Sequence, residues 1–323
     1  MPLTATPSAS GTPAGTPAGT PVPAATPAEG TARMTDGTLL RTLHWPAVGR
    51  SWAVALVVHG LGEHGGRYGN VAAALTRNGI DVHAYDQRGF GGSAGRRAYV
   101  DRWSQFHDDL EERLAALGAT QPGLPLILYG HSLGAMIVLG YVLSEPSRPL
   151  PDLLVLTSPA VDADVPTWQR VVSATLDGIV PRMRFPNGAI RDGLSHDPAI
   201  REAYLRDPLC LTRSTVHFGH ELFAEQKRLQ VAIAAIDRMP VPTYVVHGSE
   251  DPIVPARASE AIGSKGNVTR RVYEGMRHET HHEYGFEQVT ADTVAWLEAQ
   301  RSLLQAGGPP GANPPGMPEA SGV

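Results

Sequence analysis

Short motifs along the chain contain side chains that could act together in nucleophilic catalysis, and the first surrounds Ser132. The string GHSLG, residues 130–134, follows the apolar run Leu124–Tyr129 and begins the helical pattern Leu133–Leu143. G-x-S-x-G between a strand and a helix is typical of a nucleophile elbow, a sharp turn that raises the serine hydroxyl above the sheet. Glycines on both sides let the strand and the helix approach closely. We predict that Ser132 is the nucleophile, with a chance match to a common pattern as the alternative.

The stretch RHETHHE, residues 277–283, allows two interpretations of His278. Residues 278–282 match H-E-x-x-H, a zinc-protease signature that needs two histidines on one face of a continuous helix and a third protein ligand. A continuous helix is not expected, because Gly275 follows the strand pattern Arg270–Tyr273 and interrupts the chain just before His278. We therefore predict that His278 lies on a loop as a general base, and that no metal is bound.

The acid that orients the base is expected beyond the strand pattern Thr243–His247. Catalytic groups of open α/β sheets gather at the C-terminal ends of the strands, and Asp251 lies just past this end. The neighbouring Glu250 is the competing carboxylate. The order Ser132, Asp251, His278 is the chain order of triads built on a nucleophile elbow, which favours Asp251.

Backbone N–H groups must stabilise the negative charge that develops on a carbonyl oxygen when a serine attacks it. The N–H of Leu133 is one expected donor, because it belongs to the residue after the nucleophile. The glycine-rich string HGLGEH, residues 59–64, lets the backbone turn inward, and Leu61 is the second predicted donor. An ordinary glycine-rich turn is the alternative for this string.

The elements that must position these motifs alternate along the chain. Strand-length apolar runs separated by helical patterns predict an α/β fold, a mostly parallel sheet with helices on both faces. The predicted strands are Ala53–His59, Asp81–Tyr85, Leu124–Tyr129, Leu153–Leu156, Thr243–His247 and Arg270–Tyr273. The predicted helices are Gly69–Asn78, Asp101–Leu117, Leu133–Leu143, Ala256–Ile262 and Glu283–Leu304.

Other regions depart from this alternation. Residues 1–33 repeat Thr-Pro-Ala-Gly units, and residues 306–323 are also rich in glycine and proline, so both tails are predicted to be disordered. Residues 161–236 form a long, largely helical-looking insertion, which we predict to be a lid, or cap, over the site. The predicted core is then residues 34–160 and 237–305.

Composition excludes several classes of partner. The chain has 323 residues, 42% of them hydrophobic, and a formal net charge of −5 without a basic stripe, so nucleic acid is not an expected partner. Cys210 is the only cysteine, which excludes an intrachain disulfide. No apolar run approaches the roughly 20 residues of a membrane span, and no signal sequence is recognisable. We expect a cytoplasmic protein without a cofactor.

We also hypothesise that translation starts at Met34. The intact mass of the native protein tests this hypothesis, because a mass that includes residues 1–33 would contradict it.

Five motifs give the chain a resemblance to the monoacylglycerol lipase group of α/β-hydrolases, which is related to lysophospholipases and serine-aminopeptidase-type hydrolases. The most specific is HGLGEHGGRY, and the others are DQRGFGGS, GHSLG, HGSED and GMRHE. The resemblance covers nearly all of residues 35–303. It implies the α/β-hydrolase fold with an inserted cap, and hydrolysis of monoacylglycerol to fatty acid and glycerol by a triad of Ser132, Asp251 and His278. The family often has histidine where Phe90 stands, a loop position where we expect little consequence.

The substrate stays open within this fold. Lysophospholipids, short-chain carboxylic esters and N-terminal peptide bonds are the alternatives, and a non-catalytic binding module is the alternative from another class. Glu63, His64 and Arg67 are interpreted as residues that hold the oxyanion loop by local bonds, with contact to glycerol as the alternative. Cys210 is interpreted as a small apolar residue, with a reactive thiol as the alternative. The expected partner is a small lipid ester. The apolar clusters of the insertion are interpreted mainly as packing of the lid against the core, with some exposed surface left for transient contact with a membrane surface.

Overall fold

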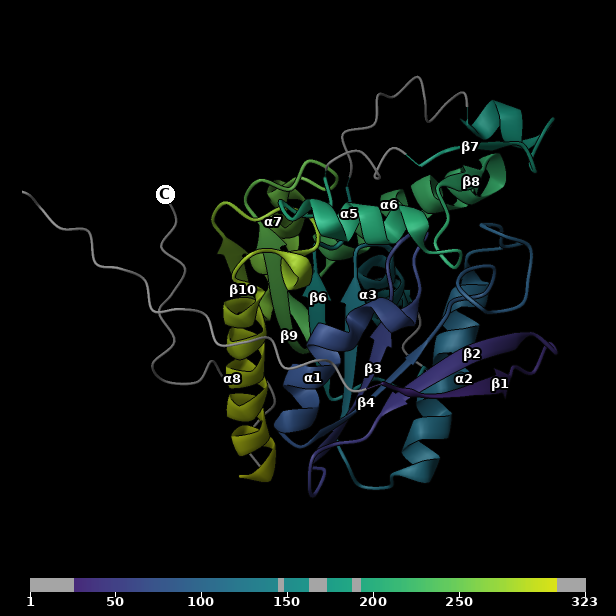
Figure 1. The fold of residues 1–323 in the computed structure, drawn as a ribbon. Coiled ribbons are helices and arrows are strands. Elements are labelled where there is room, and N and C mark those ends of the chain that lie inside the picture. Colours follow the sequence, from purple (N-terminus) through teal and green to yellow (C-terminus); the bar gives the residue numbers. More distant parts are fainter. Residues whose placement is uncertain (1–25, 145–147, 163–172, 188–192, 307–323) are drawn as a thin grey trace, which may run out of the picture.

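An eight-stranded sheet forms the centre of the computed structural model, which describes residues 26–144, 148–162, 173–187 and 193–306. The strand order is β1-β2-β4-β3-β5-β6-β9-β10 (Figure 1). From β4 to β10 all neighbours are parallel, whereas β1 and β2 add an antiparallel edge. The strands are β1 (Ala28–Arg33), β2 (Leu39–Trp45), β3 (Ala53–Val58), β4 (Ile80–Tyr85), β5 (Leu126–His131), β6 (Leu153–Thr157), β9 (Arg238–Gly248) and β10 (Gly266–Tyr273).

The sheet is buried on both faces, which is why its parallel strands are continuously apolar. Successive residues of β3 belong to different apolar clusters. Val57 packs in the cluster supplied by α1 (Gly69–Arg77) and α8 (Phe286–Gln305), and Val58 packs in the cluster supplied by α2 (Ser104–Thr120) and α3 (Leu133–Ser144). The expected mostly parallel α/β sheet with helices on both faces is thus confirmed.

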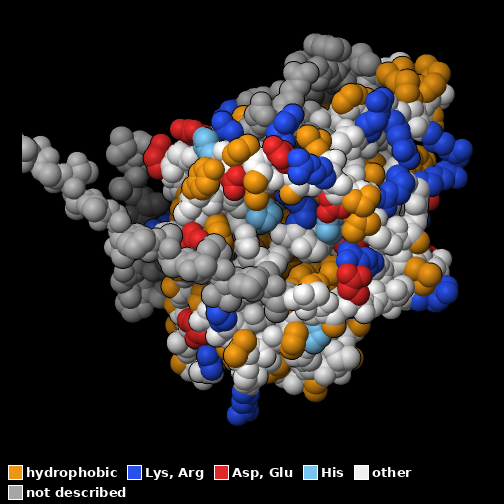
Figure 2. Space-filling model, viewed as in Figure 1, with side chains coloured by type: hydrophobic (Ala, Val, Ile, Leu, Met, Phe, Trp, Pro, Cys, Tyr) orange, Lys and Arg blue, Asp and Glu red, His pale blue; other side chains and the backbone are white. Residues whose placement is uncertain are grey.

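The insertion between β6 and β9 lies above the C-terminal ends of the parallel strands (Figure 1). Its described part is mostly helical, with residues 173–177 and two longer helices, and it also contains a small antiparallel sheet that the sequence analysis does not predict. These elements are β7 (Arg184–Pro186), α5 (Pro198–Arg206), β8 (Arg213–Thr215) and α6 (Val216–Ala235). Figure 2 shows hydrophobic and arginine side chains gathered on the surface near β7 and β8. The insertion is therefore a separate layer that faces the edge where catalytic groups gather.

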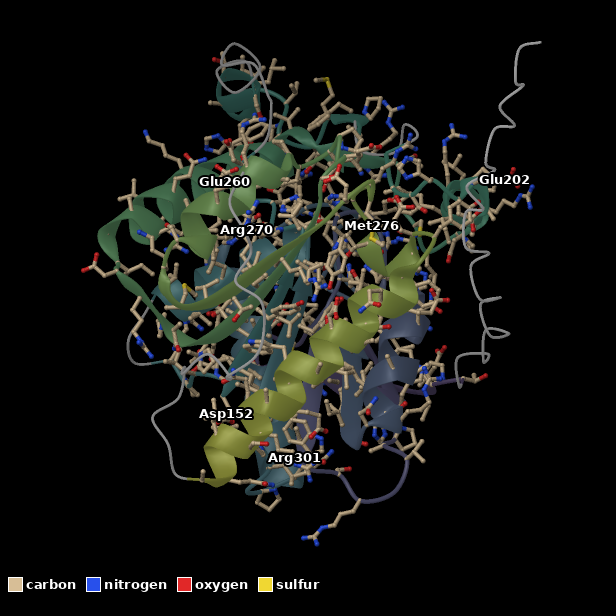
Figure 3. The ribbon with its side chains drawn as sticks, turned by 90° about the vertical axis from the view of Figure 1, so that its left-hand side faces the viewer. Asp152, Glu202, Glu260, Arg270, Met276 and Arg301 are labelled. Atoms are coloured by element: carbon tan, nitrogen blue, oxygen red, sulfur yellow. The ribbon has the colours of Figure 1, made fainter. Side chains whose placement is uncertain are left out.

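The helix α8 covers one face of the sheet along its length, as Figure 3 shows. Trp296 and Leu297 of α8 are buried against the sheet, and the Trp296 ring stacks on that of Tyr244 in β9, with 5.4 Å between ring centroids. Five residues after Trp296, the Arg301 guanidinium lies 5.0 Å from the ring centroid of Trp52. None of the described helices combines the length and the apolar composition that crossing a bilayer requires.

The N-terminal boundary predicted at residue 33 is wrong. Residues 28–33 form β1, which pairs with β2 over the whole length of the strand. This segment lacks the prolines of the preceding repeat, so every residue can take part in the ladder. The apolar-run criterion also misses β2, whose sequence LLRTLHW buries Leu40, Leu43 and Trp45 between polar residues. A translation start at Met34 would remove β1, and residues 1–25 and 307–323 lie outside the described residues.

Several predicted helices begin later or are shorter than the sequence suggests. The helix expected from Glu283 begins at Phe286, after Gly285 with its φ of 81°. The helix expected over Ala256–Ile262 is a 3₁₀ turn, η3 (Ala256–Ser259), followed by the single turn α7 (Glu260–Gly263). Two further 3₁₀ turns flank the site, η1 (Gly65–Tyr68) and η4 (Thr280–His282).

The close packing of α3 on β3 predicts the effect of a methyl group at Gly134. A Cβ atom there would overlap the carbonyl oxygen of Val58. Because the obstacle is backbone, Gly134→Ala should lower the free energy of unfolding by about 3 kcal/mol or more, as measured by urea denaturation. Gly118→Ala in α2 is the matched control, since the atom nearest to its Cβ would be Cδ1 of Leu126, 3.9 Å away. That change should stabilise the protein by about 0.5–1 kcal/mol. Equal stability of the two variants would contradict this account of the packing.

Candidate active site

Ser132 lies in a strained turn between β5 and α3. Its φ of 51° falls in the left-handed region that residues other than glycine rarely occupy. The backbone N–H donates to the carbonyl of Thr157 at 2.9 Å, and the carbonyl accepts from the N–H of Met136 at 3.1 Å. Gly130 permits the turn, because a Cβ there would lie 2.7 Å from the Cα of Ala135. The turn therefore has the geometry of the predicted nucleophile elbow.

The side chains of Ser132, His278 and Asp251 form one hydrogen-bonded chain. Nε2 of His278 lies 2.9 Å from Oγ of Ser132, and Nδ1 lies 2.7 Å from Oδ2 of Asp251. The Ser158 hydroxyl donates to the carbonyl of His278 at 2.8 Å and so holds the loop after β10. The structure thus brings together the three residues that the sequence selects. The competing Glu250 side chain is exposed and pairs with His196 instead.

Opposite charge decides the ionisation of Asp251 and His278. Burial alone would raise the pKa of Asp251, but the charge of His278 and hydrogen bonds from His247, His278 and the Val254 N–H hold it well below its usual range. Burial alone would lower the pKa of His278, but the charge and hydrogen bond of Asp251 raise it. An ionised Asp251 can only accept, so Nδ1 of His278 carries the proton and Nε2 is left to accept from Ser132.

The predicted oxyanion donors, Leu61 and Leu133, both line one cavity. Leu61 precedes Gly62, whose φ of 74° is a conformation that glycine adopts without steric penalty. The carbonyl of Gly62 accepts a hydrogen bond from the Tyr204 hydroxyl at 2.8 Å and another from the N–H of Leu211 at 2.6 Å. The insertion therefore fixes the outer side of the Leu61 loop.

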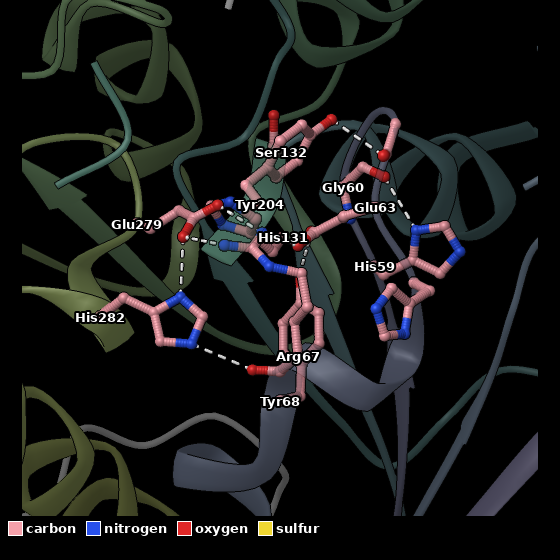
Figure 4. Close-up of polar contacts among 12 residues, drawn as sticks. His59, Gly60, Glu63, Arg67, Tyr68, His131, Ser132, Tyr204, Glu279 and His282 are labelled. Carbon is pink, nitrogen blue, oxygen red and sulfur yellow. Dashed lines mark hydrogen bonds and ion pairs between the residues drawn. The ribbon is translucent and has the colours of Figure 1, made fainter. Parts of the chain in front are cut away.

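A buried ion network fixes the inner side of that loop (Figure 4). Arg67 pairs with Glu63 and makes two bonds to Glu279, at 2.7 and 2.8 Å. Oε1 of Glu63 also accepts from the N–H of Gly60 at 2.6 Å. Burial would raise the pKa of both glutamates, but the Arg67 charge lowers both, that of Glu279 strongly. Because Glu279 follows His278, one guanidinium connects the loop of the predicted oxyanion donor Leu61 (the oxyanion loop) to the loop of the predicted base His278 (the base loop).

His64 also makes local bonds. Its Nε2 lies 2.9 Å from Oδ2 of Asp207 in the insertion, and its Nδ1 accepts from the N–H of Gly66 at 3.1 Å. Together with the pairing of Glu63 and Arg67, these bonds support the interpretation that the three side chains hold the loop, against the alternative of contact with glycerol.

The cavity beside Ser132 has a volume of about 590 Å³, which is within the range of small-molecule sites. Both the core and the insertion contribute to its lining, which is largely apolar. The apolar lining residues are Leu61, Leu133, Ala160, Phe185, Pro186, Leu194, Phe218, Leu222, Phe223, Pro252, Ile253 and Val254. Such a cavity can take an apolar chain whose reactive end meets the Ser132 hydroxyl.

Neighbouring histidines have structural environments. His131 is buried, its Nδ1 lies 2.9 Å from Oγ1 of Thr157, and burial lowers its pKa to about 4. Nε2 of His59 accepts from the N–H of Gln87 at 2.9 Å, and burial lowers its pKa as well. Both rings are therefore neutral near pH 7. Phe90 packs edge to face against His59, with ring centroids 6.2 Å apart, so it serves as a packing residue.

The thiol of Cys210 lies half-buried in the insertion. Burial raises its pKa to about 12. The thiolate is the reactive form of cysteine, so this environment favours the interpretation of Cys210 as an unreactive residue.

Metal-ligating side chains gather in three places among the described residues, and one of them, Glu279 with His281 and His282, overlaps the H-E-x-x-H string. His278 lies on a loop before η4, so the helix that a zinc protease needs does not form. Arg67 already occupies the Glu279 carboxylate. His282 uses both ring nitrogens, on Glu279 at 2.7 Å and on the Arg67 carbonyl at 3.0 Å. This geometry fits an ion network rather than a catalytic zinc. The other groups are His64 with Asp207 and Cys210, and His44 with Asp81 and His83.

Comparison with known proteins identifies the family. A family model described as serine aminopeptidase, S33, matches residues 49–285. The chain belongs to this family. The monoacylglycerol lipase of Mycolicibacterium smegmatis is 31% identical over 256 residues, which cover 76% of this chain and 87% of the relative. The monoglyceride lipase of Homo sapiens is 28% identical over 286 residues, which cover 85% and 92%.

Solved structures share the fold of this S33-family chain. The monoacylglycerol lipase of Paleococcus ferrophilus has a TM-score of 0.71 at 26% identity, with 80% of this chain and 98% of that chain covered. A soluble variant of the monoglyceride lipase of Saccharomyces cerevisiae, solved with a substrate analog, has a TM-score of 0.75 at 23% identity and covers 86% and 97%. The predicted α/β-hydrolase fold is therefore confirmed, and so is the prediction that the chain is a serine hydrolase.

Sequence reasoning misses several residues that complete the site of this family member. Ser158 holds the His278 carbonyl, and His247 contributes a ring nitrogen 3.3 Å from Oδ2 of Asp251. Ser158 directly follows β6, and His247 lies shortly before Asp251 in the chain. These positions are signals that could have identified both residues. Tyr204 lies in the insertion, and no motif marks it.

The Arg67 network makes a prediction about stability. Arg67→Ala leaves two buried carboxylates without their partner, so the free energy of unfolding should fall by about 3–5 kcal/mol in urea denaturation. Arg206→Ala is the matched control, because Arg206 pairs with Glu202 on the surface of α5. Exposed pairs of this kind contribute at most about 0.5 kcal/mol, so little change is expected there. A loss at Arg67 no larger than that at Arg206 would mean that the network does not hold the loops.

Proposed function

We propose that this chain hydrolyses carboxylic esters of the monoacylglycerol class to a fatty acid and glycerol. The observation that supports this proposal is the Ser132–His278–Asp251 chain of hydrogen bonds at the wall of an apolar cavity. Relatives named monoacylglycerol or monoglyceride lipase add to it. An apolar cavity that ends at a nucleophile accommodates an acyl chain and places its ester carbonyl at the reacting oxygen.

The proposed mechanism has two acyl transfers. His278 Nε2 takes the proton of Ser132 as its oxygen attacks the ester carbonyl, and Asp251 stabilises the imidazolium that results. The N–H groups of Leu61 and Leu133 hold the oxyanion. The imidazolium then gives its proton to the departing glycerol oxygen, which leaves an ester between the acyl group and Ser132. Water then attacks the acyl carbonyl and gives a proton to His278, which passes it to the Ser132 oxygen as the bond to the acyl group breaks and the fatty acid is released.

The described lining of the cavity offers no free carboxylate to a substrate with a cationic group, which favours neutral esters. An aminopeptidase needs carboxylates that hold the substrate ammonium, and a choline headgroup needs similar compensation. The carboxylates among the lining residues are Glu63 and Glu279, and Arg67 already neutralises them in part and occupies their oxygens. A neutral glycerol moiety makes no such demand, so monoacylglycerol ranks above lysophospholipids and N-terminal peptide bonds.

We infer that the insertion serves as the lid and contacts lipid surfaces. Ile179, Met183 and Phe185 of the insertion are exposed apolar residues, and Arg182 and Arg184 alternate with Met183 and Phe185. Apolar side chains beside arginines suit the interface of an anionic lipid layer. Phe185 also lines the cavity, so the same surface connects lipid to the site.

A substrate panel tests the proposed function. Long-chain monoacylglycerols should give higher kcat/KM than triacylglycerols, lysophospholipids and aminoacyl amides, because the cavity is apolar and offers no free carboxylate. Hydrolysis is measured as fatty acid release by the purified full-length chain. A clear preference for aminoacyl amides would replace the proposal with an aminopeptidase.

Ser132→Ala supplies the blank for that panel. It should lower kcat by roughly 10⁴–10⁶ and abolish labelling by a fluorophosphonate, while circular dichroism stays that of the wild type. Inactivity of the wild type on every ester, with no labelling, would favour the non-catalytic binding module.

The raised pKa of His278 predicts the pH dependence of the reaction. The neutral imidazole is the active base, so kcat/KM should fall as the pH drops through the pKa of His278, above its ordinary value of 6.5. Asp251→Asn removes the charge that raises the pKa of His278, so the opposing effect of burial dominates and lowers this pKa. The acidic limb should move to lower pH, and the plateau of kcat should fall on the order of 10⁴-fold.

The matched control for this pH profile is Glu250→Gln, which changes the adjacent exposed carboxylate. It should leave the limb where the wild type has it, with a p-nitrophenyl ester as substrate. A limb that stays in place in Asp251→Asn, or that moves in Glu250→Gln, would show that Asp251 is not the partner of the base.

A further inference from the structure

A fully buried histidine, His247, lies beside the acid of the triad. It is the second-last residue of β9 and precedes Asp251 by four positions. Nε2 of His247 lies 3.3 Å from Oδ2 of Asp251, the same oxygen that lies 2.7 Å from Nδ1 of His278. The imidazole of His247 therefore contacts the one oxygen on which the orientation of the base depends.

The partners of His247 decide which of its ring nitrogens carries the proton. Nε2 lies 2.8 Å from the carbonyl oxygen of Val254, which can only accept, so Nε2 carries a proton. Nδ1 lies 3.0 Å from Oγ of Ser259, which accepts from Nε of Arg270 at 2.8 Å. The Ser259 hydrogen can go to Nδ1, because the competing carbonyl of Ala256 accepts from Nη2 of Arg270 at 2.9 Å. A neutral ring with its proton on Nε2 thus satisfies both nitrogens.

The Nε2–H group of His247 holds the turn that carries Asp251. Oδ1 of Asp251 accepts from the N–H groups of Ile253 and Val254, both at 2.9 Å. The bond from His247 to the Val254 carbonyl fixes the residue that supplies one of these two donors. The positive end of the same N–H also lies beside Oδ2, where it favours the ionised carboxylate. His247 therefore acts on both oxygens of Asp251, on one through the turn and on the other directly.

We propose that His247 is a positioning residue for the proposed hydrolysis, and that it fixes the Asp251 carboxylate in the orientation that directs His278 toward Ser132. This role rests on the proposed function, because only a reaction through Ser132 makes the orientation of His278 matter. The distance of 2.9 Å between Nε2 of His278 and Oγ of Ser132 depends on the ring orientation that Asp251 sets. Rotation of the carboxylate would turn the base away from the nucleophile and leave the substrate cavity unchanged.

Two substitutions of His247 separate the roles of its ring nitrogens. The amide of His247→Asn reaches the position of Nδ1 near Ser259 but falls short of Val254 and Asp251, whereas the amide of His247→Gln reaches the position of Nε2. His247→Asn should lower kcat on a p-nitrophenyl ester about 10-fold, on the scale of one hydrogen bond near a charged group. KM should stay unchanged, because His247 is not a lining residue of the cavity. His247→Gln should keep at least about half of the wild-type kcat, since it retains this bond.

The Asp251→Asn background decides whether His247 acts through Asp251. In that background His247→Asn should lower kcat by less than about 2-fold, because the charge that His247 positions is already gone. A merely structural role would give the same loss in both backgrounds. The matched control is His83→Leu, which removes an imidazole 2.9 Å from another carboxylate, that of Asp81, outside the cavity lining. It should keep the kcat of the wild type.

Labelling of Ser132 by a fluorophosphonate gives a second readout on the full-length chain. The labelling rate should fall in His247→Asn and recover in His247→Gln, as kcat does. Circular dichroism and urea denaturation check the fold of each variant, and His247→Leu replaces His247→Asn if the latter does not fold. Labelling of a wild type that does not hydrolyse monoacylglycerols would contradict the proposed substrate alone. Equal losses in both Asp251 backgrounds, a His247→Gln variant as slow as His247→Asn, or an effect on KM only would overturn the role of His247.

Discussion

The guanidinium of Arg67 is the constraint on which the geometry of the site depends. Removing charges from water costs free energy that pairing recovers only where the geometry is tight and the remaining hydrogen-bonding positions are filled. Here Glu279 accepts two bonds from Arg67 and contacts His282, and Glu63 accepts bonds from Arg67, the Gly60 N–H and the Tyr68 hydroxyl. Separation of the two loops would leave a buried charge unpaired. Electrostatics therefore fixes the distance between the oxyanion loop and the base loop, which the short loops alone could not do.

The same network acts on the chemistry of His278. Two carboxylates face one guanidinium, so an excess of negative charge remains beside the imidazole. Glu279 and Glu63 each contribute to the raised pKa of His278, after the larger effect of Asp251. Their field favours the imidazolium that forms while Ser132 attacks. The ion network thus holds the loops and also stabilises charge in the proposed reaction.

Local patterns were sufficient for the parts of the site that depend on one segment. The Ser132 elbow follows from glycines between a strand and a helix, and the loop position of His278 follows from Gly275. Pairing over long sequence distances was not predictable: no pattern near Arg67 indicates that it reaches Glu279, 212 positions along the chain. The strand β1 was missed for a related reason, because AEGTAR has almost no apolar residues and forms a strand only since β2 offers an open edge.

The bonds between the insertion and the core limit where substrate can enter. The carbonyl of Leu194 accepts from the N–H of Glu279 at 2.8 Å, and Tyr204 bonds to Gly62. Movement of these parts would disturb the base loop and the oxyanion loop at once. By contrast Phe185 and Pro186, on the three-residue strand β7, line the cavity and are also exposed. Two residues of the cavity lining therefore belong to an exposed strand, beside the apolar and arginine surface.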